Sequence, residues 1–196
     1  MSTDLGPVDV LGAEAIGQPG QRRFRLFARS PRGSAVMWME KEQLNSLSLA
    51  LDRFLAQLSG GQWLRTEAQA GQRRQPASMP TSFPRTPDYD FRVAQIKIGY
   101  DEYHNRFLLS VIPLEILMEP GQEPQAIIDE EAAVAFFFDL QQAQQLSEDI
   151  TTIVSAGRPV CPFCGTPLDG SPHACVKQNG HHQIVVIDEN EDEEEE

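Results

Sequence analysis

Hydrophobic and polar positions alternate along the first part of the chain with the period of β-strands. Two alternating stretches between Val8 and Arg29 flank Gln18-Pro19-Gly20, and a Pro-Gly pair is a strong turn signal. The pattern predicts a β-hairpin, followed by a third strand over Ser34–Met39. Apolar residues then recur at the helical period from Lys41 to Leu58, which predicts an amphipathic helix.

The same succession returns after residue 88. Alternation predicts strands over Phe91–Tyr100, Arg106–Met118 and Ala132–Phe138, and the aromatic run that ends the last strand indicates burial on both faces. A helix follows from Asp139 to Ala156, with Asp139 and Gln142 spaced as a capping box. Residues 60–88, between the two series, are rich in Gln, Arg, Pro, Gly and Ser, a composition typical of a surface loop or a disordered linker.

The two series correspond to each other, which indicates an internal duplication. Ile16-Gly17 matches Ile98-Gly99, and Arg23-Phe24 matches Arg106-Phe107, while an offset of 99 residues aligns the third strands and the helices. The sequence therefore predicts an α+β fold of two βββα repeats, whose pairing covers the sheet faces that single helices leave bare. The alternative is that any two amphipathic sheet–helix segments align this well.

Composition divides the chain into five expected segments. They are a first βββα unit over 1–59, a flexible linker over 60–88, a second βββα unit over 89–157, a zinc knuckle over 158–187 and a disordered acidic tail over 188–196.

The net charge of −13 is concentrated at one end of the chain. Residues 188–196 hold eight acidic side chains, so the remainder carries only −5. Without a basic stripe, the chain is not expected to bind nucleic acid. Its apolar runs are too short to span a membrane, and its N-terminus lacks the pattern of a signal peptide. We therefore expect a cytoplasmic protein.

Cys161, Cys164, His173 and Cys175 form the strongest chemical motif, with the spacing C-x2-C-x8-H-x-C. Thiolate and imidazole are the ligands that Zn²⁺ prefers, and a two-residue gap lets one turn present two sulfurs. Four protein ligands leave no open position on the ion, so we expect the Zn²⁺ to be structural. His181 and His182 lie near enough in sequence to replace His173.

Other chemistries for these cysteines are a disulfide, a redox pair or three incidental thiols. A disulfide leaves one cysteine over, and nothing in the sequence indicates an oxidising compartment. A redox C-x-x-C motif normally opens a helix, whereas Gly165-Thr166-Pro167 favours a turn.

Several motifs of the chain resemble a bacterial domain-of-unknown-function family, number 3090. The resemblance covers nearly the whole chain except 60–88 and the acidic tail, and it rests on these segments: Gly17-Gln18-Pro19-Gly20-Gln21-Arg22, Glu40-Lys41-Glu42-Gln43, Ala156-Gly157-Arg158-Pro159, Cys161-Pro162-x-Cys164-Gly165-x-Pro167-Leu168-Asp169, His173-x-Cys175 and Asn179-Gly180. The resemblance implies no reaction. As a partner it implies a phosphatase-like or kinase-like protein.

Two further constellations have both a functional and a structural interpretation. The turn from Gly17 to Arg23 has the glycines and arginines of an anion site, but no helix follows it, which favours an ordinary hairpin turn. Asp101, Glu102 and His104 have the residue types of acid–base catalysis, yet adjacent carboxylates in a polar turn are usually only solvated.

Two classes of function remain. The first is a monomeric, non-enzymatic interaction or adaptor protein with an unidentified protein partner and a structural Zn²⁺. The second is an enzyme or a binder of small anionic ligands, which uses a cleft between the repeats where Arg23 and Arg106 converge. A continuous apolar core between the repeats favours the first class, which we prefer, and a convergent charged pocket favours the second.

Overall fold

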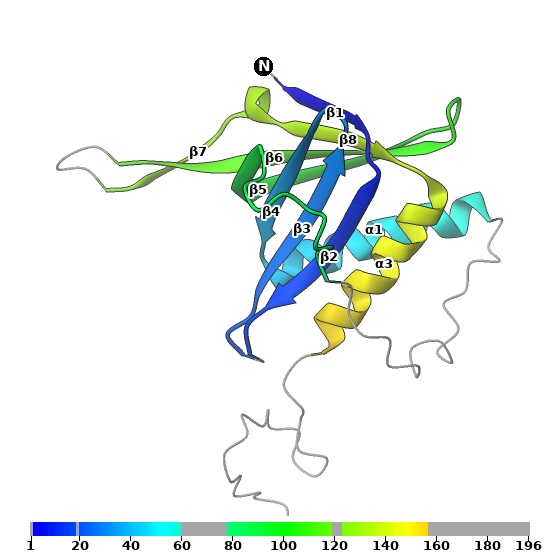
Figure 1. Cartoon of the computed structure of the whole chain (residues 1–196), viewed down its shortest axis with the longest axis horizontal. Helices are drawn as coiled ribbons and strands as arrows, with labels where there is room; N and C mark the ends of the chain where they lie inside the picture. The colour runs from blue at the N-terminus through cyan, green and yellow to red at the C-terminus, as the bar shows by residue number, and fades with distance from the viewer. Residues whose placement is uncertain (1, 19, 60–77, 119–122, 157–196) are drawn as a thin grey trace, which may run out of the picture. The chain divides into compact units, whose positions relative to one another are not determined.

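Eight strands, two α-helices and a short 3₁₀-helix make up the described part of the computed structural model, which covers residues 2–18, 20–59, 78–118 and 123–156 (Figure 1). The elements are β1 (Thr3–Pro7), β2 (Val10–Ile16), β3 (Arg23–Ser30), β4 (Gly33–Met39), α1 (Lys41–Leu58), β5 (Tyr89–Asp101), β6 (Arg106–Leu117), β7 (Gln125–Ile128), η1 (Glu130–Ala132), β8 (Val134–Phe138) and α3 (Leu140–Ser155). The expected α+β class is confirmed. The predicted zinc knuckle and acidic tail lie outside the described residues, and the two repeats remain a prediction.

The strands form one sheet in the order β1-β8-β6-β5-β4-β3-β2, with β7 paired to β6. Neighbouring strands are antiparallel except for two parallel pairs, β1 with β8 and β4 with β5. Only two residues separate β1 from β2, and they too are hydrogen-bonded: the Val8 amide donates to the Phe137 carbonyl at 2.9 Å and the Asp9 amide to that of Arg29 at 2.9 Å. This two-residue link therefore connects β1 and β2, which stand at the two ends of the strand order.

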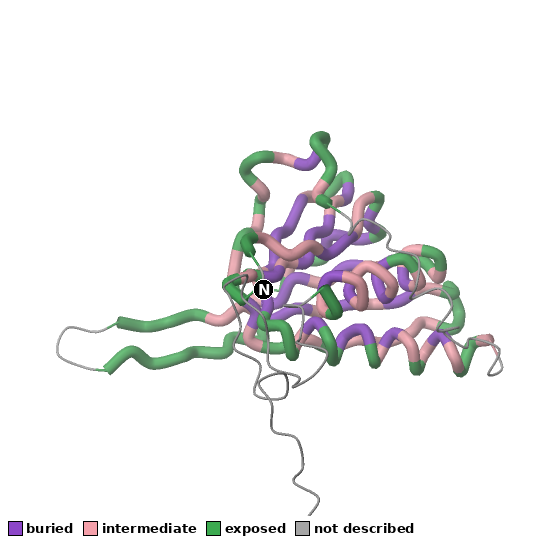
Figure 2. Tube along the Cα trace, turned by 90° about the horizontal axis from the view of Figure 1, so that it is seen from below, coloured by how far each residue is buried: buried purple, intermediate pink, exposed green. Residues whose placement is uncertain are grey.

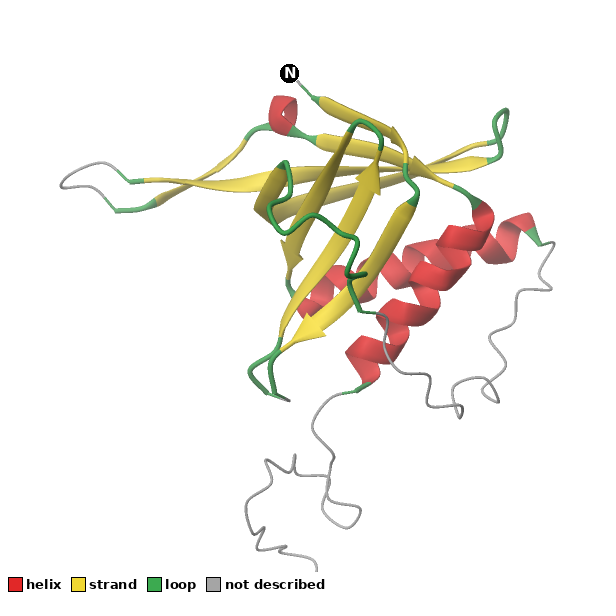
Figure 3. Cartoon of the chain, in the orientation of Figure 1, coloured by secondary structure: helices red, strands yellow, loops and turns green. Residues whose placement is uncertain are grey.

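Both helices lie on one side of this bent sheet and enclose the core with it (Figure 3). The main core is continuous across the described residues of the compact unit 1–157. Fully buried side chains from both series meet in it, including Leu26, Leu51, Phe107, Phe136 and Ile150. One core over this many residues means that neither series has a core of its own.

The helices begin where the local signals indicate. Glu40 and Asp139 are the N-caps, and each is joined to Gln43 or Gln142 in a complete capping box. The predicted helix Lys41–Leu58 is confirmed at both ends. The second helix is one residue shorter at each end than the predicted Asp139–Ala156, because these two residues are its caps.

Strand registers repeat between the two series, with one correction. Phe24 is opposite Met39 just as Phe107 is opposite Phe138. However, the residue opposite Arg106 is Asp101, whereas the one opposite Arg23 is Ile16. The matching of Ile16-Gly17 with Ile98-Gly99 was therefore wrong by three residues. Two of the three arise because six residues separate Ile16 from Arg23, whereas four separate Asp101 from Arg106.

Two strands escaped the sequence analysis, and two expectations need correction. β1 and β7 lack an alternating apolar pattern: only Leu5 and Gly6 are buried in β1, and β7 is exposed throughout. Phe137 is only partly buried, so β8 is not buried on both faces. Residues 78–88 form no helix or strand, as expected of a loop. Nevertheless Phe83 is anchored, only 5% exposed and 5.7 Å from the Phe27 ring.

No helix in the described ranges is long and apolar enough to cross a membrane.

Candidate functional site

The predicted zinc ligands Cys161, Cys164, His173 and Cys175 lie outside the described residues, as do His181 and His182. Within the described ranges, no three His, Cys, Asp or Glu side chains gather as a metal site. The zinc hypothesis therefore remains a prediction from spacing.

The glycine-rich segment from Gly17 to Arg23 forms the turn between β2 and β3. Gly17 and Gly20 have φ of 101° and 95°, values that glycine adopts readily, and the Gln21 amide donates to the Gln18 carbonyl at 2.9 Å. Arg22 donates to the Ala156 carbonyl. The geometry is that of a hairpin turn whose first arginine is engaged by the end of α3.

Arg23 and Arg106 each lie over an aromatic ring of the adjacent strand. The Arg23 guanidinium is 4.9 Å from the Trp38 ring centroid, and that of Arg106 is 3.9 Å from that of Phe137. Because β4 and β5 separate their strands in the sheet, the two arginines do not converge on an anion pocket as the second class of function requires.

Asp101 and His104 organise the turn between β5 and β6. The Asp101 carboxylate accepts bonds from the Tyr103 and His104 amides, both at 3.1 Å, and lies 2.6 Å from His104 Nδ1. The hydrogen bond with the His104 side chain is the largest cause that lowers the pKa of Asp101 below its ordinary value. The carboxylate is committed to the turn, and the Glu102 side chain is exposed.

Gln43 and Gln142 have a second function that sequence analysis missed. Each side-chain oxygen accepts from the N-cap amide of its own helix, at 2.9 Å from Glu40 and 3.0 Å from Asp139. The amide nitrogen of Gln142 also donates to the Val8 carbonyl at 2.9 Å, and that of Gln43 to the Val93 carbonyl at 3.2 Å. Gln142 thus ties the start of α3 to the link between β1 and β2, and Gln43 ties the start of α1 to Val93, where β5 passes from pairing with β4 to pairing with β6.

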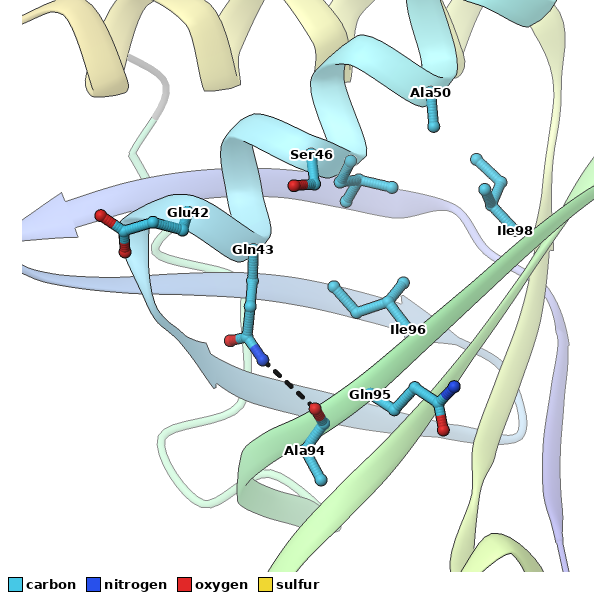
Figure 4. A pocket seen from close by; sticks show the side chains of 9 residues that line it. Glu42, Gln43, Ser46, Ala50, Ala94, Gln95, Ile96 and Ile98 are labelled. Carbon is cyan, nitrogen blue, oxygen red and sulfur yellow. Dashed lines mark hydrogen bonds between the residues drawn. The ribbon is translucent and has the colours of Figure 1, made fainter.

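A groove of about 370 Å³ opens between α1 and β5, one element from each series (Figure 4). Its floor is apolar, and Glu42 is the one charged side chain among the lining residues, which are Glu42, Gln43, Ser46, Leu47, Ala50, Ala94, Gln95, Ile96 and Ile98. An acidic rim over an apolar floor suits an apolar occupant rather than an anion.

The ends of β6 and β7 project from the sheet as a two-stranded arm, which we define as residues 114–118 and 123–128 (Figure 1). Eight large apolar side chains are exposed in the described ranges, and five of them belong to the arm: Ile116, Leu117, Met118, Ile127 and Ile128. Figure 2 shows both strands of the arm exposed over most of their length, with an intermediate stretch at the base. The sequence predicted a strand here but not its exposure.

One face of the arm is wholly apolar. Leu114 is opposite Ile128 and Ile116 is opposite Ala126, and residues opposite each other in an antiparallel pair point to the same side. Ile116 and Ile128 are 54% and 56% exposed. A two-stranded ribbon alone is at best marginally stable in water, so this apolar face has the character of a binding surface.

Comparison with known proteins agrees with the resemblance seen in the motifs. A family model described as "Protein of unknown function (DUF3090)" matches residues 4–175, a range that ends at Cys175. No curated protein and no solved structure gives a significant match. The chain therefore belongs to domain-of-unknown-function family 3090.

Proposed function

We propose that this protein is a non-enzymatic interaction protein of the cytoplasm, which binds a protein partner through the apolar arm. The observation that carries the proposal is the concentration of exposed Ile, Leu and Met side chains on residues 114–118 and 123–128. Contiguous exposed apolar surface of this kind marks protein-binding sites. A strand ribbon also offers the outer backbone edge of β7, which can pair with a strand of the partner.

The remaining geometry supports binding rather than catalysis. The core is continuous between the two series, which is the arrangement that favours the interaction class. The acid–base candidates Asp101 and His104 are bonded within a turn. Arg23 and Arg106 are each stacked on a separate ring.

We further propose that the chain arose by duplication of a βββα unit. Two kinds of repeated contact support this, namely the registers of β3–β4 and β6–β8 and the hydrogen bonds from Gln43 to Val93 and from Gln142 to Val8. The packing of α1 on α3 supports it as well. In the helix contact, Ser48 Oγ lies 3.2 Å from Ser147 Oγ, and these residues are 99 apart, the offset that aligns the helices. Residues related by a twofold axis meet in this way when they lie on the axis.

We also propose a structural Zn²⁺ held by Cys161, Cys164, His173 and Cys175. The chemistry of the donor set fits a closed tetrahedral site. Elemental analysis of purified protein is expected to give one zinc per chain, and Cys164→Ser is expected to lose it. Equal zinc content in both proteins contradicts the proposal.

Quantitative affinity capture from native cells tests the binding proposal. The bait is the full chain, compared with Ile116→Lys on the arm and with Leu49→Lys, a control on α1 with similar exposure (51% against 54%). Proteins that bind through the arm are expected to disappear with Ile116→Lys and to remain with Leu49→Lys. A set of captured proteins that is the same for all three baits contradicts a binding role for the arm.

A further inference from the structure

The arm and the α1–β5 groove are complementary features of the same chain. The apolar face of the arm carries Leu114, Ile116, Ala126 and Ile128, with no charged side chain among them. The groove has an apolar floor that includes Leu47 and Ile98. Neither feature is covered by any other described residue of the unit, and each suits the other chemically.

The groove opens beside the base of the arm. Val93 of β5 pairs with Pro113 of β6, and the arm begins at the next residue of β6. Ala94 and Gln95, the next residues of β5, line the groove. From Pro113 to Met118 the extended chain spans about 17 Å. Two copies related by a twofold axis near this base can therefore exchange arms over a short distance.

Surface area favours a second copy over a partner that takes one arm alone. Stable interfaces bury about 800 Å² per partner, and the apolar face of one arm presents only the side chains of Leu114, Ile116, Ala126 and Ile128. A twofold dimer makes the arm–groove contact twice and doubles the buried area. Glu115 is on the opposite face of the arm from Ile116, so it stays in water when the apolar face is covered.

We propose that two copies of this chain form a twofold dimer in which the arm of each lies in the α1–β5 groove of its partner. This inference rests on the proposed binding role of the arm, and it identifies the partner as a second copy of the same chain. It differs from the monomer expected from the sequence, because a chain read without its fold gives no sign that Ile116, Leu117 and Met118 lie outside the core.

Sedimentation equilibrium of the full chain tests the dimer. The wild type is expected to be dimeric at micromolar concentration. Ile116→Lys on the arm and Ala50→Trp in the groove are each expected to raise the dissociation constant by about tenfold or more. Leu49→Lys, on α1 but outside the groove lining, is expected to leave it unchanged. A monomeric wild type overturns the inference, as does a dimer that neither variant weakens.

A mixing experiment separates arm-in-groove contact from stacking of arm on arm. In a mixture of the Ile116→Lys and Ala50→Trp chains, the intact arm of the latter can enter the intact groove of the former. Fluorescence transfer between differently labelled chains is therefore expected in the mixture, while each variant alone stays monomeric. Absence of mixed dimers overturns the arm-in-groove assignment.

The outcomes also distinguish this inference from the proposed function. Should the wild type be monomeric while the arm still captures other cellular proteins in an Ile116-dependent manner, the dimer is refuted and the interaction role stands. Should the arm neither capture proteins nor support self-association, both are refuted.

Discussion

The contact of α3 with β2 and the contact of α1 with β5 each join the two series, but they differ in closeness. α3 packs extensively on β2, whereas α1 makes a looser contact with β5 and leaves the groove. Ala13 of β2 faces Leu26 across the strands as Ile98 of β5 faces Leu109, so the two residues occupy equivalent positions. Ala13 is fully buried, while the larger Ile98 is only partly buried.

This difference shows how one arrangement of elements provides both a scaffold and a site. A small side chain in β2 lets a helix approach closely and close the core. A bulky side chain at the matching position of β5 is consistent with a helix held farther away, which leaves apolar surface for an occupant. The arm, inserted between β6 and β8 of the second series, has no counterpart between β3 and β4. Both elements of the proposed interface thus lie where the two series differ.

Truncation of the shared core is expected to have the largest effect and to be the same in both series. Leu51 and Ile150 are both fully buried, and they are 99 residues apart. Leu51→Ala and Ile150→Ala should each lower the free energy of unfolding by about 2–5 kcal/mol. Urea denaturation should show one transition for either variant. Two separate transitions contradict a single core.

Enlarging a side chain is expected to be more destabilising at the close α3–β2 contact than in the α1–β5 groove. Ala13→Leu overpacks the α3–β2 contact and should lower the free energy of unfolding by about 1–3 kcal/mol. Ala50→Leu extends into the groove and keeps a good helix former, so the free energy of unfolding of the monomer should change by less than about 0.5 kcal/mol. Thermal or urea unfolding checks both. Equal costs would show that the groove is as closely packed as the α3–β2 contact.

Loss of the hydrogen bonds from Gln142 to Val8 and from Gln43 to Val93 should show the same difference between the two contacts, with smaller changes in the free energy of unfolding. Gln142→Ala removes a 2.9 Å bond to the Val8 carbonyl on the closed side and should cost about 1–2 kcal/mol. Gln43→Ala removes weaker bonds of 3.2 and 3.4 Å beside the groove, where water can replace the amide. It should cost less than Gln142→Ala in urea denaturation, and the reverse order contradicts the account.

The two hairpin turns should differ in their response to pH. The glycine turn between β2 and β3 has no carboxylate in the position of Asp101. Because the hydrogen bond with His104 lowers the pKa of Asp101, the folded protein binds this proton less readily than the unfolded chain. The stabilisation is therefore present above the ordinary pKa of about 3.9 and is lost as the pH falls through and below it.

Asp101→Asn tests this pH dependence. The variant should be less stable than the wild type at neutral pH, and the difference should shrink below about pH 4. Matched melting curves across this range measure it. A difference that is independent of pH indicates that the turn does not depend on the charge of Asp101.

Sequence analysis succeeded where the signal is local. The period of Leu44, Leu47 and Leu51 and the capping boxes at Glu40 and Asp139 define helices without reference to the rest of the chain. It failed where the partner is distant. Nothing in Thr3–Pro7 reveals that this segment pairs in parallel with β8, some 130 residues away. The second bonds of Gln43 and Gln142 depend equally on the fold.

The site was harder to predict than the fold for a related reason. Four of the five residues of Leu114–Met118 are apolar, as in a buried strand, and only the extent of β5 shows that no described strand lies beside them in its place. The groove depends on the contrast between Ala13 and Ile98, which the motif alignment had placed three residues out of register. Exposure is a property of the neighbours, so a local pattern cannot give it.

Photo-crosslinking from the arm tests the central claim most directly. A benzophenone side chain in place of Ile116 is irradiated in a mixture of ¹⁴N-labelled and ¹⁵N-labelled full-length chains, and the linked peptides are identified by mass spectrometry. We expect mixed-isotope crosslinks to residues 42–50 of α1 or 94–98 of β5. Crosslinks confined to a single copy, or mixed crosslinks only between two arms, contradict the exchange of arms between two copies.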